Sequence, residues 1–245
     1  MYKNSIYRVM QNEQIAKDIY KMVLRGDTRF LTRPGQFVNI RIAGQYLRRP
    51  ISVCDWDGDS FTILYKTVGR GTRKMAAMPA GTELDILTGL GNGFDAEAAV
   101  GKKVVLIGGG VGVPPLYALA KALLARGISP AVVLGFNDKE SVFYRDAFEA
   151  LGLRVHVTTV DGSVGIKGFV TDALKEISYD YYYCCGPQPM LRAVWKTGKQ
   201  GELSFEERMG CGFGACMGCS CKTLTGSKRI CVEGPVMKST EVIFE

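Results

Sequence analysis

Four cysteines near the C-terminal end constrain what this part of the chain can fold into. Cys211, Cys216, Cys219 and Cys231 follow the spacing C-x4-C-x2-C-x11-C. This spacing is typical of the thiolate ligands of a plant-type [2Fe–2S] cluster, with a shorter interval before the last ligand. Small residues fill the gaps between the first three cysteines, which lets backbone N–H groups approach the sulfurs of a cluster. The spacing therefore predicts a C-terminal segment that wraps an iron–sulfur cluster.

Two other uses of these cysteines are alternatives. A zinc ribbon also takes four thiolates, but it is usually built from two C-x2-C pairs, and this chain has the single pair Cys216 and Cys219. Disulfides are disfavoured because crowded cysteines in an intracellular chain more often bind metal. We expect Cys221, which lies outside the spacing, to be a spectator. Three more cysteines lie in or beside apolar runs and are expected to be small buried hydrophobes: Cys54, Cys184 and Cys185.

The composition indicates a folded chain kept in a reducing compartment. With 47% apolar and 22% charged residues, the 245 residues suit one large or two moderate domains with a short appendage. Residues 1–20 carry charges throughout and lack the apolar core of a signal peptide, so we expect a cytoplasmic protein.

Charge and hydropathy limit the classes of partner. The net charge of +7 is spread along the chain without a basic block, which argues weakly for anionic cofactors or an acidic partner and does not establish nucleic-acid binding. The apolar stretch 104–120 is interrupted by glycines and prolines, so we expect a strand, a turn and a helix start instead of a membrane span. The single histidine, His156, lies in a β-branched run, which disfavours a histidine-dependent hydrolase.

Short strands separated by turns fill residues 1–99. Turn signals at Pro34-Gly35, Asp57-Gly58 and Ala80-Gly81 separate them, and strands at this spacing predict a small antiparallel β-barrel. The expected strands are Gln36–Ile40, Arg49–Val53, Ser60–Tyr65 and Glu83–Leu87.

From residue 100 buried strands alternate with helices. This alternation predicts an α/β domain over residues 100–206, a doubly wound, parallel, five-stranded sheet with helices on both faces. The expected strands are Val104–Ile107, Ala131–Gly135, Arg154–Val160, Asp180–Cys184 and Glu202–Glu206. The expected helices are Leu116–Arg126, Arg145–Leu151, Val170–Ile177 and Met190–Lys199. Residues 207–245 are too few for an apolar core of their own, and we expect them to depend on the cluster.

Two glycine-containing turns follow strands of this sheet. The run G-G-G-V-G-V-P-P at Gly108–Pro115 lies where a pyrophosphate would meet the N-terminus of the first helix. Because Val113 replaces the last glycine of G-x-G-x-x-G, a purely structural turn is the alternative. The second turn, C-G-P-Q-P-M at Cys185–Met190, follows the fourth strand. Ligands of open α/β sheets bind at the carboxyl ends of the strands, so both turns are expected to border one crevice.

The second expected barrel strand begins with two arginines. The run Arg48-Arg49-Pro50-Ile51-Ser52 places a guanidinium group and a hydroxyl group close together. An arginine fork suits a diphosphate, and a serine can hydrogen-bond the edge of a flavin ring. The alternative is a pair of solvated surface arginines.

Taken in order, seven motifs resemble those of the ferredoxin reductase-type flavoproteins, and within them those of the electron transfer subunits of class 1B dihydroorotate dehydrogenases. They are R-P-I-S at 49–52, L-Y-K at 64–66, G-R-G-T at 69–72, G-L-G-N-G-F at 89–94, G-G-G-V-G-V-P-P at 108–115, C-G-P-Q-P-M at 185–190 and E-E-R-M-G-C-G-F-G-A-C-M-G-C at 206–219. The glycine motifs are shared across the superfamily. The cysteine block that directly follows the nucleotide domain is specific to few of its members.

The resemblance implies three cofactors. FAD would be bound by Arg49, Pro50, Ile51, Ser52, Leu64, Tyr65, Lys66, Gly71 and Thr72. NAD would be bound by Gly108, Gly109, Gly110, Val111, Gly112, Val113, Pro114, Cys185, Gly186 and Pro187. The [2Fe–2S] cluster would be held by Cys211, Cys216, Cys219 and Cys231.

The resemblance also implies an oxidoreductase subunit of de novo pyrimidine biosynthesis. A nicotinamide exchanges two electrons together and a [2Fe–2S] cluster accepts one, and FAD can divide the pair. Dihydroorotate would be oxidised on the FMN of a partner catalytic subunit, in a heterotetramer with two copies of each chain. Two alternatives stay open: a stand-alone NAD(P)H-dependent reductase of a soluble acceptor, and a zinc-stabilised nucleotide-binding regulator.

Overall fold

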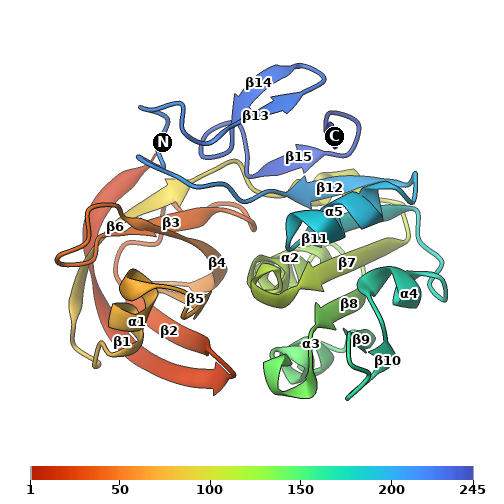
Figure 1. Ribbon diagram of the computed structural model, residues 1–245, viewed down its shortest axis with the longest axis horizontal. Coiled ribbons are helices and arrows are strands. Elements are labelled where there is room, and N and C mark those ends of the chain that lie inside the picture. The colour runs from red at the N-terminus through yellow and green to blue at the C-terminus, as the bar shows by residue number, and fades with distance from the viewer. Residues whose placement is uncertain (1, 245) are drawn as a thin grey trace.

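The computed structural model describes residues 2–244 and has three parts. A β-barrel built from the N-terminal residues lies beside an α/β unit, and a two-stranded C-terminal hairpin lies along the top of the view in Figure 1. The two larger parts correspond to the two patterns in the sequence, turn-separated strands up to residue 99 and alternating strands and helices from residue 100.

The barrel is closed and antiparallel, with the strand order β1-β2-β5-β4-β3-β6. Four of its strands were predicted, and they are β3 (Phe37–Ile40), β4 (Arg49–Asp57), β5 (Ser60–Lys66) and β6 (Glu83–Leu90). Two strands and a helix were not predicted, and they are β1 (Lys3–Ala16), β2 (Ile19–Arg25) and α1 (Arg70–Ala76). Of the fourteen residues of β1, only Tyr7 and Val9 are buried, so the strand lacks a sustained apolar alternation.

The α/β unit is built on a seven-stranded sheet with the order β10-β9-β8-β7-β11-β12-β15. The five predicted parallel strands are β7 (Val104–Gly109), β8 (Ala131–Phe136), β9 (Val155–Thr159), β11 (Tyr181–Cys185) and β12 (Gln200–Ser204). The sequence did not predict the two edge strands, the parallel β10 (Ile166–Lys167) and the antiparallel β15 (Val236–Lys238).

Helices cover both faces of the sheet, as predicted. Val104 and Leu106 of β7 face the core under α2 (Pro114–Leu124) and α3 (Arg145–Ala150), while Val105 and Ile107 face the core under α4 (Val170–Leu174) and α5 (Gln188–Trp195). Burial on both faces explains why this strand reads as a continuous apolar run. Three short 3₁₀ segments connect these elements at Ala96–Ala99, Gly110–Gly112 and Lys139–Ser141. Among residues 2–244, every helix is too short or too polar to cross a membrane.

The C-terminal segment is more firmly built into the protein than the sequence predicted. It forms the hairpin β13 (Ser220–Thr223) and β14 (Gly226–Arg229), and then β15 pairs with β12. Its apolar side chains Ile230, Met237 and Val242 join the core under α4 and α5. The segment thus shares a core with the sheet, and its dependence on the cluster stays a prediction.

Candidate functional site

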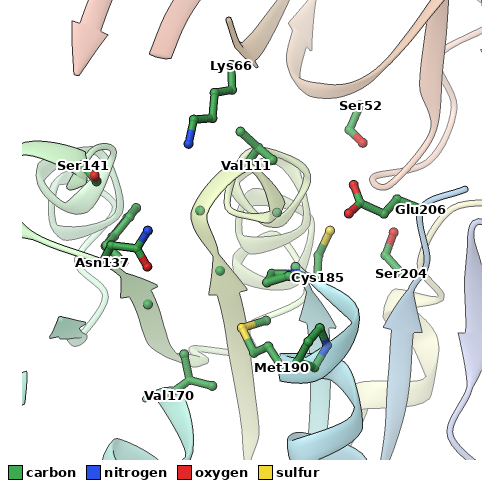
Figure 2. A pocket seen from close by; sticks show the side chains of 18 of the residues that line it. Ser52, Lys66, Val111, Asn137, Ser141, Val170, Cys185, Met190, Ser204 and Glu206 are labelled. Carbon is green, nitrogen blue, oxygen red and sulfur yellow. The ribbon is translucent and has the colours of Figure 1, made fainter. Parts of the chain in front are cut away.

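A cavity of about 690 Å³ lies between the barrel and the carboxyl edge of the sheet (Figure 2). The barrel contributes Pro50 and Ser52 of β4 and Lys66 of β5. The sheet contributes the residues at the ends of its central strands, among them Gly109, Gly110, Val111, Gly112, Gly135, Cys185, Gly186, Pro187 and Ser204. The cavity is thus the crevice that the sequence predicted at the carboxyl ends of the strands.

The two glycine turns touch each other on one side of this cavity. A Cβ atom on Gly112 would run into the backbone carbonyl of Cys185, and a Cβ on Gly109 would lie 2.5 Å from Met190 Sδ. Only glycine permits this approach of one turn to the other, so the glycines are required by packing as well as by any ligand. The two turns therefore form one continuous surface of the cavity. The sequence motifs, taken separately, did not predict their direct contact.

Not every residue predicted at the NAD site reaches the cavity. Gly109–Gly112 and Cys185–Pro187 line it. Gly108 lies beneath, where a Cβ would be 2.9 Å from Val113 Cγ2, and the Val113 side chain is fully buried under the sheet. Pro114 begins α2 and is buried as well. These three residues position the turn from below.

Of the residues predicted to bind FAD, likewise, only some line the cavity. Pro50, Ser52 and Lys66 line the cavity, whereas Leu64 and Tyr65 are buried in the barrel wall. The Tyr65 hydroxyl donates a hydrogen bond to Asn12 Oδ1 at 2.8 Å. Ile51 packs partly buried against the barrel core. Strand alternation accounts for Ile51 and Tyr65, which point to the face opposite that of Pro50, Ser52 and Lys66. Leu64 lies on the same face as Lys66 and is buried in the core shared with the α/β unit.

Arg49 and Arg48 have different surroundings although they are adjacent. Arg48 donates to Asp85 Oδ1 at 2.9 Å and to the Asp85 carbonyl at 2.9 Å, which ties it into the barrel. Arg49 lies half-buried over Gly71, where a Cβ atom would collide with its guanidinium group, and it donates to Gln45 Oε1 at 3.0 Å. The structure thus brings Arg49 and Gly71 together, and neither of them lines the cavity, although Pro50, the neighbour of Arg49 in β4, does.

Thr72 has a local structural role. Its Oγ1 accepts hydrogen bonds from the backbone N–H groups of Val68 and Gly69, at 3.0 and 3.2 Å. These contacts hold the loop that enters α1 in place. Because this loop follows directly from β5, Thr72 fixes the position of Gly71 next to Arg49.

Several polar residues of the cavity were not predicted. Figure 2 shows Ser204 and Glu206 near Cys185 and Ser52 at one end of the cavity, and Asn137 and Ser141 at the other end. Ser204 is the parallel partner of Cys185 in the register of β11 and β12. Burial raises the pKa of the Cys185 thiol to about 12, and its hydrogen bond with Ser204 offsets part of that rise. The sequence predicted a strand at Glu202–Glu206. Its end lies at the cavity because β12 pairs with β11, and the sequence did not predict this strand order.

The four predicted cluster ligands lie in the C-terminal segment. Cys219 and Cys231 are buried, and Cys211 and Cys216 are partly exposed. The backbone N–H of Cys216 donates to Cys211 Sγ at 3.3 Å. Burial raises the pKa of Cys211, but backbone N–H groups directed at its sulfur, that of Cys216 foremost, lower the pKa to about 6. A loop that turns its N–H groups toward a sulfur fits a thiolate ligand of an iron–sulfur cluster.

The remaining thiols differ from this pattern. Burial raises the pKa of Cys231 to about 12, and the neighbouring Cys219 thiol adds to the rise. Burial also raises the pKa of Cys221, which lies on β13. Within residues 2–244, no three Cys, His, Asp or Glu side chains converge in the arrangement of a single-metal site. Cys54, Cys184 and Cys185 are buried, as predicted.

Two family models match parts of the chain. Residues 206–243 match the iron-sulfur cluster binding domain of dihydroorotate dehydrogenase B. Residues 106–196 match the oxidoreductase NAD-binding domain. The first interval contains all four cysteines of the predicted ligand set, and the second contains both glycine turns.

Full-length relatives extend the match to the barrel. The chain is 46% identical to the dihydroorotate dehydrogenase B (NAD(+)) electron transfer subunit of Fusobacterium nucleatum, with 97% of each chain covered. It is 44% identical to the corresponding subunit of a Geobacillus species, with 100% of each chain covered.

Solved structures share the architecture. A structure described as an NADH-dependent reduced ferredoxin-NADP oxidoreductase, from a study of flavin-based electron bifurcation, is 29% identical, with a TM-score of 0.86 over 98% of this chain and 90% of that chain. Phthalate dioxygenase reductase, at 21% identity and a TM-score of 0.63 over 79% of this chain and 63% of that chain, shares the fold alone. On the full-length identity and the matching cysteine segment, the chain belongs to the family of dihydroorotate dehydrogenase B (NAD(+)) electron transfer subunits.

Proposed function

We propose that this chain carries electrons between NAD+ and a dihydroorotate-oxidising partner subunit in de novo pyrimidine biosynthesis, as an oxidoreductase subunit with FAD and a [2Fe–2S] cluster. One observation carries the proposal. Two glycine turns and the barrel strand β4 line a single cavity in a chain whose cysteine segment matches that of the family. Family membership favours this function over a stand-alone reductase and over a zinc-stabilised regulator.

The two walls of the cavity would bind different cofactors, NAD on the sheet side and FAD on the barrel side. On the sheet side, the backbone of Gly109–Gly112 and of Cys185–Pro187 would hold NAD, because glycines let a diphosphate approach the start of α2. Gly108, Val113 and Pro114 would support this turn from below. The Lys66 side chain, exposed and directed into the cavity in Figure 2, adds a positive charge for the phosphates.

On the barrel side, two groups of residues would hold FAD. Arg49 beside Gly71 would bind the diphosphate, with Thr72 holding that loop in place. Pro50, Ser52 and Lys66 would contact the flavin ring and ribityl chain, and the inward-packed Ile51, Leu64 and Tyr65 would hold these two strands in position. The Ser52 hydroxyl faces the cavity and suits a hydrogen bond to the ring edge. Bound FAD would supply the exchange between two-electron and one-electron steps.

The four cysteines of the predicted set would hold the [2Fe–2S] cluster, which supplies one-electron transfer. In this scheme the chain has three functional units, an FAD barrel over 1–99, an NAD domain over 100–206 and a cluster domain over 207–245. The contact between the cysteine segment and the barrel would place the cluster close to the flavin side of the molecule.

The partner would be an FMN-containing catalytic subunit, in a cytoplasmic heterotetramer with two copies of each chain. Exposed apolar side chains between Cys211 and Cys219 support a docking surface for this partner on the cysteine loop, residues 211–219. Phe213 is 37% exposed and Met217 is 65% exposed. Tyr2, itself exposed, packs against Phe213 with the rings tilted and 5.5 Å between their centroids. Exposed aromatic and methionine side chains are typical of protein interfaces.

Purification alone and with the catalytic subunit tests the proposal. We expect flavin and iron–sulfur absorption bands in the purified chain, a complex of two chains of each kind, and NADH formation from NAD+ and dihydroorotate only in the complex. A coloured chain that reduces a soluble acceptor and binds no catalytic subunit would support a stand-alone reductase instead. A colourless, zinc-containing chain would contradict the proposal.

A further inference from the structure

The outer face of barrel strand β3 is covered by the cysteine segment. Val38 and Ile40 point into the barrel core, so Phe37 and Asn39 point outward. Phe37 belongs to the core that contains Cys219 and Cys231. Asn39, the next residue on that face, is only 1% exposed although its side chain is polar. The strand therefore shares a core with two of the predicted cluster ligands.

Asn39 makes one side-chain hydrogen bond across this contact. Its Nδ2 donates to the backbone carbonyl of Cys211 at 3.0 Å. A carbonyl only accepts, so this bond fixes which end of the amide faces the loop. Its Oδ1 is buried and has no hydrogen-bond partner in the described part of the chain. A half-satisfied buried amide is costly for a fold, so its presence at this position calls for a role beyond barrel stability.

A second side chain, that of Arg229, is bound to the same loop. Arg229 Nη1 donates to the Gly214 carbonyl at 2.8 Å, and Arg229 is itself paired with Glu233 at 2.6 Å. Two carbonyls of the loop between Cys211 and Cys216 are thus bound to side chains. In a trans peptide the N–H points opposite to the C=O, so these bonds fix which way the next N–H groups point.

Gly212 permits the close approach of Asn39. Its φ is +78°, and a Cβ atom there would collide with Asn39 Nδ2. In the barrel, Asn39 is paired across the strands with Pro50, which lines the cavity next to Arg49. One pair of strands therefore connects the flavin side of the cavity to the first residue of the cysteine loop.

We propose that Asn39 is a positioning residue for the iron–sulfur cluster: it fixes the Cys211–Gly212 peptide, and so the start of the loop whose Cys216 N–H faces the Cys211 sulfur. The inference rests on the proposed function, in that the four cysteines are taken as the cluster ligands. Hydrogen bonds to the sulfurs set the reduction potential of such clusters, and residues that orient ligands affect how tightly the metal is held.

Three substitutions test this role in the full chain. Asn39→Ala removes the clamp, and Asn39→Ser leaves a polar group too short to reach the Cys211 carbonyl. Gln36→Ala is the matched control, because Gln36 is also a buried amide beside β3, but it bonds to Thr32, Arg33 and Gly91 within the barrel. The flavin content of each variant reports whether the barrel is folded.

We expect both Asn39 variants to release iron to a chelator about tenfold faster than the wild-type chain, the usual lower range for loss of an outer-shell partner. We also expect a shifted electron paramagnetic resonance signal of the reduced cluster and a shifted reduction potential, with neither change in Gln36→Ala. If a flavin-loaded Asn39 variant keeps the wild-type signal, potential and release rate, the inference is wrong. If the wild-type chain itself holds no [2Fe–2S] cluster, the proposed function fails first.

Discussion

At the scale of single residues, the two adjacent arginines show how structure separates like side chains. Arg48 is paired with the Asp85 carboxylate of the barrel wall, whereas Arg49 lies over Gly71 and its hydrogen-bond acceptors are neutral groups. The sequence predicted an arginine at a flavin diphosphate. It could not predict that Arg48 forms an ion pair with Asp85. That depends on Asp85, which lies on a different strand.

Arg49→Ala is expected to weaken FAD retention about a hundredfold or more. Hydrogen bonds to charged groups contribute roughly 1.5–3 kcal/mol each, and 1.4 kcal/mol is about tenfold in affinity. Recovery of free-flavin fluorescence on dilution measures the dissociation. Arg41→Ala is the control, since the Arg41 side chain is 70% exposed and its one ion pair, with Asp85 at 3.6 Å, lies at the surface. Unchanged retention in Arg49→Ala would move the flavin site elsewhere.

The cysteines give a second prediction at this scale. Changing Cys211, Cys216, Cys219 or Cys231 to Ser is expected to abolish the cluster, because each supplies one of its four thiolate ligands. Cys221→Ser should retain it, since Cys221 lies on β13 outside the ligand spacing. Iron and acid-labile sulfide analysis of the five variants measures the outcome. Full iron occupancy in Cys231→Ser would overturn the ligand assignment.

At the scale of elements, the sequence predicted the central strands well because their burial on both faces leaves long apolar runs. It missed β1 because most of that strand's residues are exposed, and it missed β15 because three residues carry too little pattern. The end of β12 reaches the cavity only through its parallel pairing with β11, which no local pattern encodes. Ser204 and Glu206 were therefore absent from the predicted site.

Strand β12 also carries a buried carboxylate with consequences for stability. Glu202 is 3% exposed, and its Oε2 accepts a hydrogen bond from the Asp95 N–H at 3.0 Å. Burial raises its pKa from 4.5 to about 7, opposed by the Asp95 N–H and reinforced by the Asp95 carboxylate. The folded chain therefore holds this proton more tightly than the unfolded chain does. The resulting stabilisation is complete below the unfolded pKa and is lost as the pH rises through the folded pKa.

Glu202→Gln should remove this dependence. The shift corresponds to a free energy of unfolding on the order of 3 kcal/mol that the wild-type chain loses between about pH 4 and pH 8. Urea unfolding at a series of pH values measures it. Glu97→Gln is the matched control, because Glu97 is an exposed carboxylate paired with Arg126. A Glu202→Gln variant that loses as much stability with rising pH as the wild-type chain would contradict the account.

At the scale of the whole molecule, the order of the parts was predictable from the sequence, and their contacts were not. The change from turn-separated strands to alternating helices and strands located the barrel and the sheet. The hydrogen bond between Asn39 of the barrel and Cys211 of the C-terminal segment joins residues 172 positions apart. The pairing of β15 with β12 makes the C-terminal segment part of the sheet. Such contacts arise from packing between elements and leave no periodic signal.

The proposed order of electron carriers runs from NAD on the sheet side, through FAD at the barrel, to the cluster, which would face the partner. Cys219→Ser, loaded with FAD but lacking the cluster, tests it most directly. Rapid anaerobic mixing with NADH should bleach the flavin absorbance at close to the wild-type rate. The same variant in complex with the catalytic subunit should form no NADH from dihydroorotate. A flavin that stays oxidised, or a cluster-deficient complex that forms NADH at the wild-type rate, would contradict this order.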